Sequence, residues 1–342
     1  GKEWPLVYII GRQKAASTSL AQMMFDTRLF CRPHNPNGTT GRTVFHHADG
    51  NADCRRTKGE CKEIFFHRPD NWARGTDWYL AHFGHDPHCP PPGEAPPGHL
   101  PLQRYVDATP DTFLLPAALP HFKEMLANPA APEGWRAALR YILVLREPLA
   151  AELSWHNHIV HRSRRGARGN RAFNPKRAVG SFDSKMRKEF RNLKDGRGWP
   201  YLGVLEKWLQ VIDRRQLLVL NYHNLIRDNA GTLRALGEFL GVGAEPAWIS
   251  AAGRPLVHKN ARESFKKFDM EEVDQALCRR IAVSQRTEHA GLYALLAHHR
   301  AVGEAPPMEP AFGTFPEPCV PSTPEASKHP LLTPFMGHPL KP

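Results

Sequence analysis

Apolar runs and helical segments alternate from the start of the chain. Residues 5–10 form a short apolar run containing β-branched residues, and the run ends at Gly11. Leu20, Met23 and Met24 then recur at helical spacing. A short apolar run that stops at a glycine favours a buried strand, and apolar residues three and four positions apart favour a helix. The N-terminal region therefore predicts a strand, a loop and a helix.

The same alternation continues through the middle of the chain. Residues 141–145 (YILVL) and 217–220 (LLVL) are continuous apolar runs, and Pro148 suits the first turn of a helix after the first run. Apolar residues at helical spacing within 202–212 and 233–240 predict two further helices. Because strands alternate with helices, we expect an α/β fold with a central parallel sheet flanked by helices.

The composition supports one large domain with additions. A chain of 342 residues with 41% hydrophobic content can bury a sizeable core. We expect residues 1–302 to form this domain, with loop insertions near 86–101 and near 162–197. Residues 303–342 are rich in proline and lack periodicity, so we expect them to form a disordered tail.

Positive charge is concentrated in one segment. The net charge is +12, and residues 162–197 hold thirteen Lys and Arg against three Asp and Glu. Such a patch attracts anions, including nucleotides, acidic glycans, nucleic acids and membrane surfaces. The segment is equally compatible with a solvated, flexible insertion, so charge alone does not choose among these partners.

The cysteines and histidines favour no metal site. The six cysteines contain no CxxC pair and no zinc-finger spacing. Cys54 and Cys61 are close enough to form a disulfide in an oxidising compartment, and free thiols fit the sequence equally well. His156, His158 and His161 lack an acidic or thiol partner at an obvious spacing, so we interpret them as cleft lining or surface residues.

The most chemically distinctive segment is the first loop, residues 11–19 (GRQKAASTS). A loop that delivers the chain to a helix N-terminus presents backbone N–H groups and the positive end of the helix dipole to an anion. The hydroxyls of Ser17, Thr18 and Ser19 add donors. Lys14 precedes these hydroxyls, unlike the GxxxxGK[ST] order of nucleoside triphosphatases. An ordinary helix cap would explain these residues if they stood alone.

Two segments together resemble the donor-binding motifs of sulfotransferases that use PAPS (3′-phosphoadenosine 5′-phosphosulfate). GRQKAASTSL is similar to the 5′-phosphosulfate motif GxxKxGTTxL, with Ala16 where glycine is usual. Leu145-Arg146-Glu147-Pro148 is followed by Ser154. In this family an Arg at a strand end and a Ser two helical turns later bind the 3′-phosphate of the donor.

The resemblance implies a P-loop-like three-layer fold, PAPS as co-substrate, PAP (adenosine 3′,5′-bisphosphate) as product and no metal. It implies that Lys14 stabilises the leaving phosphate. The residues that it assigns to donor binding are Arg12, Gln13, Lys14, Ala15, Ala16, Ser17, Thr18, Ser19, Arg146, Ser154, Tyr201 and Lys259.

A third segment carries the expected acceptor chemistry. Residues 62–66 (KEIFF), with Trp78-Tyr79 further along, resemble the KE..FF…WY region of Golgi glycan sulfotransferases such as the heparan sulfate enzymes. The resemblance implies that Glu63 is the general base for the acceptor, with His67 in reserve. The distance from KE to FF is one residue shorter here than is usual, and Glu63 to Trp78 keeps the family spacing.

Further segments extend the resemblance over roughly residues 5–300. Asp107-Ala108-Thr109-Pro110 resembles the EKTP or EKSP element of the same enzymes, with Ala108 in place of the lysine, and a plain Thr-Pro turn explains it equally well. Residues 198–209 resemble a packing block of the family. Lys259 and Arg262 either close over the nucleotide or form a solvated basic loop. We recognise no counterpart of the cysteine-bracketed C-terminal loop of the glycan enzymes.

We therefore expect transfer of a sulfuryl group from PAPS to a hydroxyl or amine of an acceptor, with a glycan favoured over a small molecule. Three alternatives remain: a P-loop nucleotide kinase, a non-catalytic module that binds anionic glycans, and a nucleic-acid-binding protein. The position of Lys14 argues against the kinase. No motif for reading bases is apparent, so we expect no nucleic-acid partner.

The expected location is the Golgi lumen or the secretory pathway. No apolar run approaches the ~20 residues that a membrane-spanning helix needs. The chain begins at Gly1 rather than Met, which is compatible with removal of a leader or a membrane anchor. We expect contact with a membrane only through such an anchor.

Overall fold

The protein is an α/β structure built on one parallel sheet. The computed structural model describes residues 4–34, 63–84, 89, 104–166, 182–194, 200–256, 273–301 and 312–319. Within these residues the sheet has the order β2-β1-β3-β4, and every pair of neighbouring strands is parallel. The strands are β1 (Val7–Ile9), β2 (Val106–Asp107), β3 (Arg140–Leu145) and β4 (Leu217–Asn221). The predicted fold class and the three predicted strands are confirmed.

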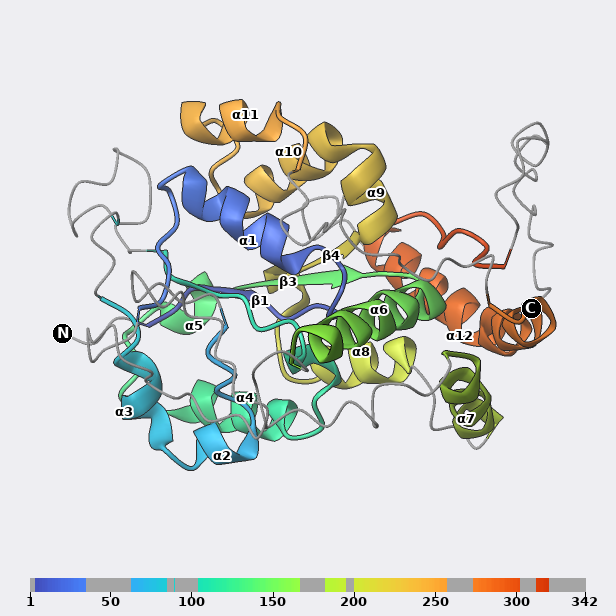
Figure 1. Cartoon of the computed structure of the whole chain (residues 1–342). Coiled ribbons are helices and arrows are strands. Elements are labelled where there is room, and N and C mark those ends of the chain that lie inside the picture. Colours follow the sequence, from blue (N-terminus) through green and yellow to red (C-terminus); the bar gives the residue numbers. More distant parts are fainter. Residues whose placement is uncertain are drawn as a thin grey trace, which may run out of the picture.

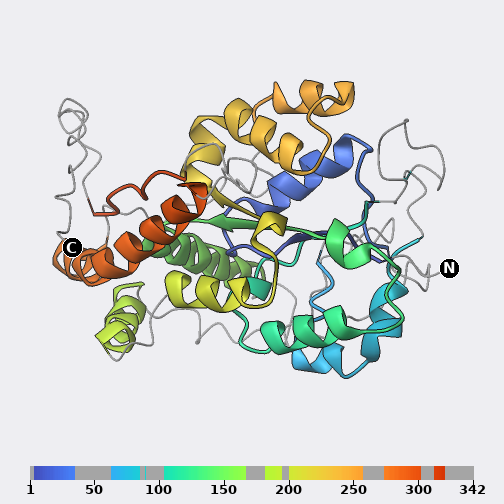
Figure 2. The same cartoon turned by 180° about the vertical axis from the view of Figure 1, so that it is seen from behind.

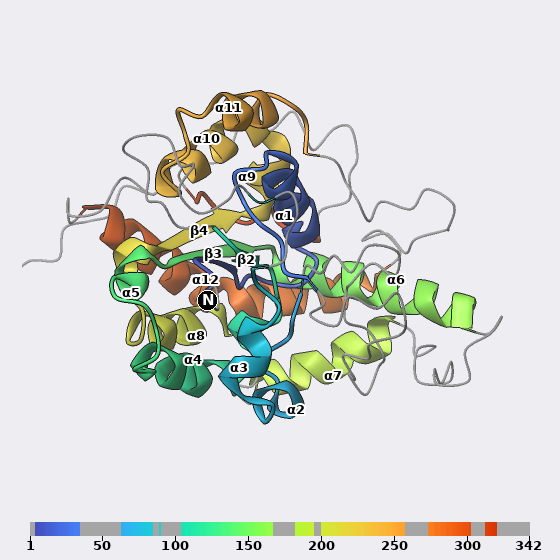
Figure 3. The ribbon, with the colours of Figure 1, turned by 90° about the vertical axis from the view of Figure 1, so that its left-hand side faces the viewer.

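Helices cover both faces of the sheet, as Figures 1 and 3 show. One layer contains α1 (Ser17–Asp26), α9 (Tyr222–Arg227), α10 (Asn229–Phe239) and α11 (Pro246–Ala252). The opposite layer contains α4 (Ala118–Ala127), α6 (Pro148–Gly166), α8 (Tyr201–Leu209) and α12 (Gln275–Ala301). In the view from behind, α12 lies beside α8 and beside α7 (Phe182–Lys194) (Figure 2). The shorter helices are α2 (Pro69–Trp72), α3 (Gly75–Leu80) and α5 (Trp135–Ala138).

The strands are apolar along their length because helices cover both faces. Every residue of β1 and β4 is buried, and so is every residue of β3 except Arg140. Aromatic side chains fill the space beneath the sheet. The rings of Tyr8 and Tyr141 stack with centroids 5.6 Å apart, and Phe122 meets Trp208 edge to face at 5.1 Å.

The helix boundaries follow local chemistry. Pro148 is the first residue of α6, as its missing N–H and fixed φ favour. Asn221 and Asp228 precede α9 and α10, and their side chains accept hydrogen bonds from the first turns. Gly241 follows α10 with φ 66°, a left-handed conformation that glycine adopts without strain.

Two disulfides join distant segments of the described chain. One links Cys31 to Cys89, and the other links Cys278 in the first turn of α12 to Cys319. These four cysteines are therefore bonded. The pair considered from the sequence, Cys54 and Cys61, lies outside the described residues.

The segment Phe312–Cys319 differs from the disordered tail expected for residues 303–342. Phe312 and Phe315 pack against the main core, and Cys319 belongs to a second, smaller core between α6, α7 and α12. This small core also contains Leu149, Leu153, Phe182, Met186, Val273, Leu277, Cys278 and Ile281. Within the described part of the chain, no helix is long and apolar enough to cross a membrane.

Gly11 allows β1 to approach β3 closely. A Cβ atom at this position would lie 2.4 Å from the backbone nitrogen of Val144 and 2.8 Å from its carbonyl oxygen. Gly11→Ala is therefore expected to push the strands apart and to lower the free energy of unfolding by about 1–3 kcal/mol, as overpacking does. Urea denaturation measures this loss.

Gly203 in α8 is the matched control. A Cβ there meets no atom within 4 Å. Gly203→Ala should leave the free energy of unfolding unchanged or raise it by up to about 1 kcal/mol, since alanine favours a helix. Equal losses at the two positions would contradict the argument from close strand contact.

Candidate active site

The loops after β1 and β3 meet at the carboxyl edge of the sheet. The backbone N–H of Ile10 donates to Ile142 O at 2.9 Å, and that of Arg12 donates to Val144 O at 3.0 Å. Beyond the strands, Nη1 of Arg146 donates to the carbonyl oxygen of Lys14 at 2.8 Å. The two candidate anion sites are therefore neighbours, at the edge where open parallel sheets bind ligands.

The first loop turns into α1 through left-handed residues. Lys14 has φ 68° and Ala16 has φ 64°, and Ala16 immediately precedes the helix. This backbone explains why glycine is usual at position 16 of the motif, since a side chain there costs roughly 1–2 kcal/mol. Left-handed residues in a short turn let successive N–H groups converge on an anion.

The N-terminus of α1 differs from those of α9 and α10 in its capping, since Asn221 and Asp228 cap the latter two with their side chains. In the described structure no side chain caps it, and its first turn holds no acidic residue. The N-terminal end of a helix carries positive partial charge, which favours an anion. Ser17 and Ser19 are buried, whereas Gln13 and Thr18 are half-buried. The N–H of Ala15 is used within the loop, where it donates to Arg12 O at 3.3 Å.

The side chain of Lys14 extends toward α6. Its Nζ lies 5.3 Å from the ring centroid of Trp155, the residue after Ser154 on that helix. Ser154 is half-buried. The structure thus brings Lys14 next to Arg146 and next to α6, the helix that carries Ser154.

Arg146 carries a buried donor that suits an anion. Its Nε is buried and meets no hydrogen-bond acceptor among the described residues. The guanidinium lies 4.4 Å from the ring centroid of Tyr222. Burial lowers the pKa of Arg146, and an arginine still keeps its charge. A buried, unpaired N–H is costly, so a phosphate oxygen at this position would relieve the cost.

Arg12, a predicted donor-binding residue, forms an ion pair within the protein. Its guanidinium pairs with Glu152 of α6, and Glu152 also pairs with Lys185 of α7. Burial would lower the pKa of Arg12, but Tyr201 and Glu152 together raise it. Burial would likewise raise the pKa of Glu152, but Arg12 and Lys185 hold it below its ordinary value. Arg12 therefore ties the loop to two helices.

Glu152 is a residue that sequence reasoning missed. The only signal was its position two residues before Ser154, on the same helix. Tyr201 also lies beneath the site rather than at its surface. It is fully buried and donates from its hydroxyl to Arg146 O at 3.1 Å, and burial raises its pKa to about 12. Lys259 and Arg262 lie outside the described residues.

The acceptor segment is held at the end of β2 by one hydroxyl. Oγ1 of Thr109 accepts from the backbone N–H groups of Ile64 at 3.2 Å and Phe65 at 3.3 Å. The same hydroxyl donates to Asp107 at 2.5 Å. The DATP element is thus a junction rather than a plain turn, and it fixes half-buried Glu63 at the sheet edge that carries Lys14.

Asp107 anchors this junction from inside the core. It pairs with Tyr8 of β1 in the sheet, and it accepts from the hydroxyl of Tyr79 at 2.8 Å. Burial raises the pKa of Asp107 to about 6. Ala108, which replaces the family lysine, is fully buried.

The histidines lie in packed surroundings. His67 stacks on Phe122 with ring centroids 4.0 Å apart, and burial lowers its pKa to about 3. The reserve base is therefore enclosed and neutral. Burial also lowers the pKa of His156, which meets Phe182 edge to face. His158 stacks on the ring of Trp155. The residues that the structure describes contain no group of His, Cys, Asp and Glu able to hold a metal ion.

The comparison with protein families decides the class. The model of the sulfotransferase domain matches residues 9–287. The chain belongs to the sulfotransferase domain family. This span includes the first loop, the DATP junction and the end of β3, so the geometry above is that of a sulfotransferase.

Solved sulfotransferases are also among the similar structures. A sulfotransferase from Alicyclobacillus acidocaldarius is 16% identical with a TM-score of 0.48, over 85% of this chain and 95% of that chain. The sulfotransferase domain from the curacin biosynthetic pathway is 14% identical with a TM-score of 0.34, over 73% of this chain and 78% of that chain. No curated protein sequence matches this sulfotransferase significantly.

A pH-dependent contribution to stability comes from Glu147, beside Arg146. Its carboxylate accepts from Leu149 N at 3.0 Å and Ala150 N at 2.6 Å, and burial nevertheless raises its pKa from 4.5 to about 7. The folded protein therefore holds a proton that the unfolded chain releases. The stability that this provides is present below pH 4.5 and is lost as the pH rises through about 7.

Glu147→Gln removes this titration. The unfolding free energy of the wild type relative to the variant should fall between pH 4.5 and about 7 and then level off, as measured by urea denaturation across that range. A difference that stays constant with pH would contradict the raised pKa.

Proposed function

We propose that this sulfotransferase transfers a sulfuryl group from PAPS to a hydroxyl or amine of a glycan. The observation that carries the proposal is the contact between Arg146 and Lys14, which joins two anion sites at one sheet edge. A donor with a phosphate at each end of an adenosine suits two such neighbouring sites. A nucleoside triphosphate would not use a second, separate phosphate site.

The donor is held from both sides. The N-terminus of α1 and the hydroxyls of Ser17, Thr18 and Ser19 bind the 5′-phosphosulfate. Nε of Arg146 and the hydroxyl of Ser154 bind the 3′-phosphate, which supplies the acceptor that Nε otherwise lacks among the described residues. Arg12 supports this site indirectly by fixing the loop to Glu152.

Catalysis relies on position and charge. Sulfuryl transfer resembles phosphoryl transfer, where a loose transition state gains most from orientation and charge neutralisation. Lys14 neutralises the charge that develops on the oxygen between sulfur and the leaving phosphate. Glu63, held by the Thr109 junction, removes the proton from the acceptor hydroxyl or amine.

The acceptor side favours an anionic glycan. Helix α7 lies within the basic segment and buries Phe182 and Met186, while Lys188 and Arg191 are exposed. Lys185 of the same helix reaches the donor loop through Glu152. Exposed cations this close to the donor would attract an acidic polysaccharide.

The proposed location is the secretory pathway, with the Golgi lumen as the preferred compartment. The two disulfides fit this location, because such bonds persist in oxidising compartments.

Transfer of radiolabelled sulfate from PAPS tests the function directly. The acceptors are a panel of desulfated glycans together with simple phenols, followed by linkage analysis of the product. We expect labelling of glycans and little labelling of phenols. Labelling of phenols alone would move the acceptor to small molecules, and binding of ATP in preference to PAP would overturn the sulfotransferase proposal.

Three substitutions separate the proposed roles. Lys14→Ala should lower kcat by about 10²–10³-fold, because it removes transition-state stabilisation, with PAP binding largely retained.

Arg146→Ala should chiefly weaken PAP binding, by about 10–100-fold, because it removes a charged hydrogen-bonding partner. Glu63→Gln should lower kcat by about 10²–10⁴-fold without changing PAP affinity.

Steady-state kinetics and calorimetric titration with PAP measure these effects, and thermal unfolding verifies that each variant is folded. Small and equal effects from Lys14→Ala and Arg146→Ala would argue strongly against the assignment. An unchanged kcat for Glu63→Gln would remove this residue as the base.

A further inference from the structure

The segment Phe312–Cys319 crosses the carboxyl edge of the sheet beside the donor site; we refer to it as the strap. Nδ2 of Asn221, the last residue of β4, donates to Phe312 O at 2.8 Å. Nδ2 of Asn224 in α9 donates to the same oxygen at 3.2 Å. Two amides from one turn therefore hold the beginning of the strap.

The middle of the strap packs into an aromatic cluster. Phe315 is buried, and its backbone N–H donates to the hydroxyl of Tyr293 at 2.8 Å. Its ring contacts His289 edge to face at 5.1 Å and Tyr201 at 6.3 Å between centroids. The strap thus rests on Tyr201, the residue whose hydroxyl binds the backbone of Arg146.

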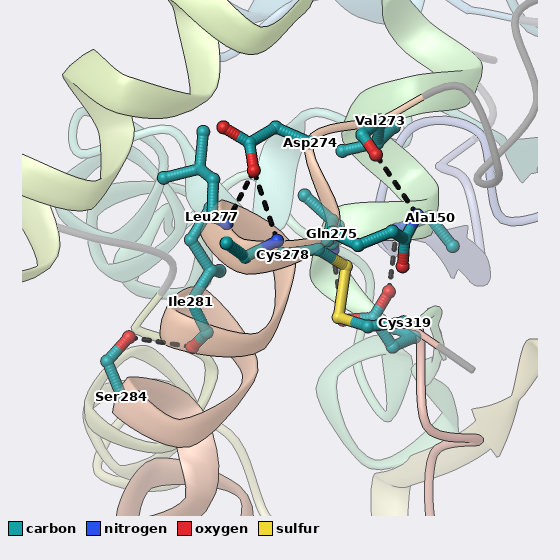
Figure 4. Close-up of a disulfide and its surroundings, with 12 residues drawn as sticks. Ala150, Val273, Asp274, Gln275, Leu277, Cys278, Ile281, Ser284 and Cys319 are labelled. Carbon is teal, nitrogen blue, oxygen red and sulfur yellow. Dashed lines mark hydrogen bonds between the residues drawn. A yellow bond between two sulfur atoms is a disulfide. The ribbon is translucent and has the colours of Figure 1, made fainter. Parts of the chain in front are cut away.

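The end of the strap is covalently fixed. Cys319 is bonded to Cys278 in the first turn of α12, where Asp274 accepts from Leu277 N at 3.0 Å (Figure 4). The sulfur atoms lie in the small core that also contains Leu149 of α6. The strap therefore ends next to α6, the helix that starts two residues after Arg146.

Contacts from the strap reach Arg146 along two routes. The first passes through Tyr201 to the Arg146 carbonyl. The second passes through Asn221 to its neighbour Tyr222, whose ring lies 4.4 Å from the guanidinium. In the sheet register Asn221 is the partner of Leu145, directly before Arg146. The backbone of Arg146 thus contacts a residue on which the strap packs, and its side chain contacts the chain neighbour of a residue that binds the strap.

We propose that the strap is a positioning element for the donor, which sets Arg146 in the orientation that binds the 3′-phosphate. The inference rests on the proposed function, in which Arg146 binds that phosphate. The strap lies outside residues 9–287, the span that matches the family model.

The expected signature is a change in donor affinity without a matching change in chemistry. Arg146 binds the backbone carbonyl of Lys14, whereas Nζ of Lys14, the group proposed to act in the transfer, lies against Trp155 of α6. Loss of the strap should therefore disturb binding at Arg146 and spare the transferring end of the donor. If the strap had only a structural role, its loss would lower the stability of the protein and leave the PAP affinity of the folded protein unchanged.

The first test uses Phe315→Ala in the full chain, with the disulfide intact. We expect PAP to bind roughly tenfold more weakly by calorimetry and the KM for PAPS to rise similarly, with kcat at saturating PAPS almost unchanged. Phe315→Leu, which keeps an apolar side chain, should restore most of the affinity. Unchanged PAP affinity in folded Phe315→Ala would overturn the proposal.

A double-mutant cycle tests whether the strap acts through Arg146. Phe315→Ala should weaken PAP binding far less in an Arg146→Ala background than in the wild type, because coupled residues are not additive. Equal fold-changes in the two backgrounds would mean that the strap acts elsewhere.

The disulfides supply a matched pair of controls. Cys278→Ser/Cys319→Ser releases the end of the strap and should weaken PAP binding in the same direction as Phe315→Ala. Cys31→Ser/Cys89→Ser removes the other described bond, where Cys31 pairs with Tyr105 next to β2, and should lower stability without changing PAP affinity. Equal losses of affinity in the two pairs would contradict a specific role for the strap. Wild-type protein that binds no PAP would instead overturn the proposed function itself.

Discussion

The close contact between β1 and β3 determines where the chemistry of this protein lies. Gly11 lets the two backbones approach, and the hydrogen bond from Arg12 N to Val144 O continues the pairing past the end of β1. Two loops that are far apart in the sequence therefore leave the sheet side by side. The contact between Arg146 and Lys14 follows from this pairing, and so does the approach of the Lys14 side chain to Trp155 of α6. A separation of these strands would place the two anion sites too far apart for one nucleotide.

Much of this framework could be predicted from the sequence. Continuous apolar runs identify strands that are buried on both faces, and three of the four described strands are of this kind. The rule that parallel strands end at one edge, together with the family resemblance, was enough to place Lys14 and Arg146 in one site. Strand β2 was not predicted, because its two residues are too short to form a pattern and Asp107 is polar. The role of Thr109 was likewise visible only as a motif, since its partners lie 44 and 45 residues away.

Contacts that depend on tertiary docking could not be predicted. Glu152 is one charged residue among many, and it becomes the partner of Arg12 and Lys185 only because α7 packs beside α6. A buried carboxylate is costly unless both of its oxygens are paired. Arg12 pairs with one oxygen of Glu152 and Lys185 with the other, so both cations stabilise its charge. The proline-rich C-terminal residues carry no periodicity, so nothing in their sequence indicates that Phe312–Cys319 returns to the sheet. That return depends on Asn221, Asn224 and a cysteine partner 41 positions away.

The second core has a consequence for the internal motions of the molecule. Its apolar residues come from α6, α7, α12, Val273 just before α12, and Cys319, and they form a cluster separate from the one around the sheet. A small apolar cluster with its own boundary can open as a unit while the sheet stays intact. Backbone amides of α7 and of the first turns of α12 should then exchange with deuterium together and earlier than those of β3. The disulfide between Cys278 and Cys319 limits how far this cluster can open, because it keeps the start of α12 joined to the strap.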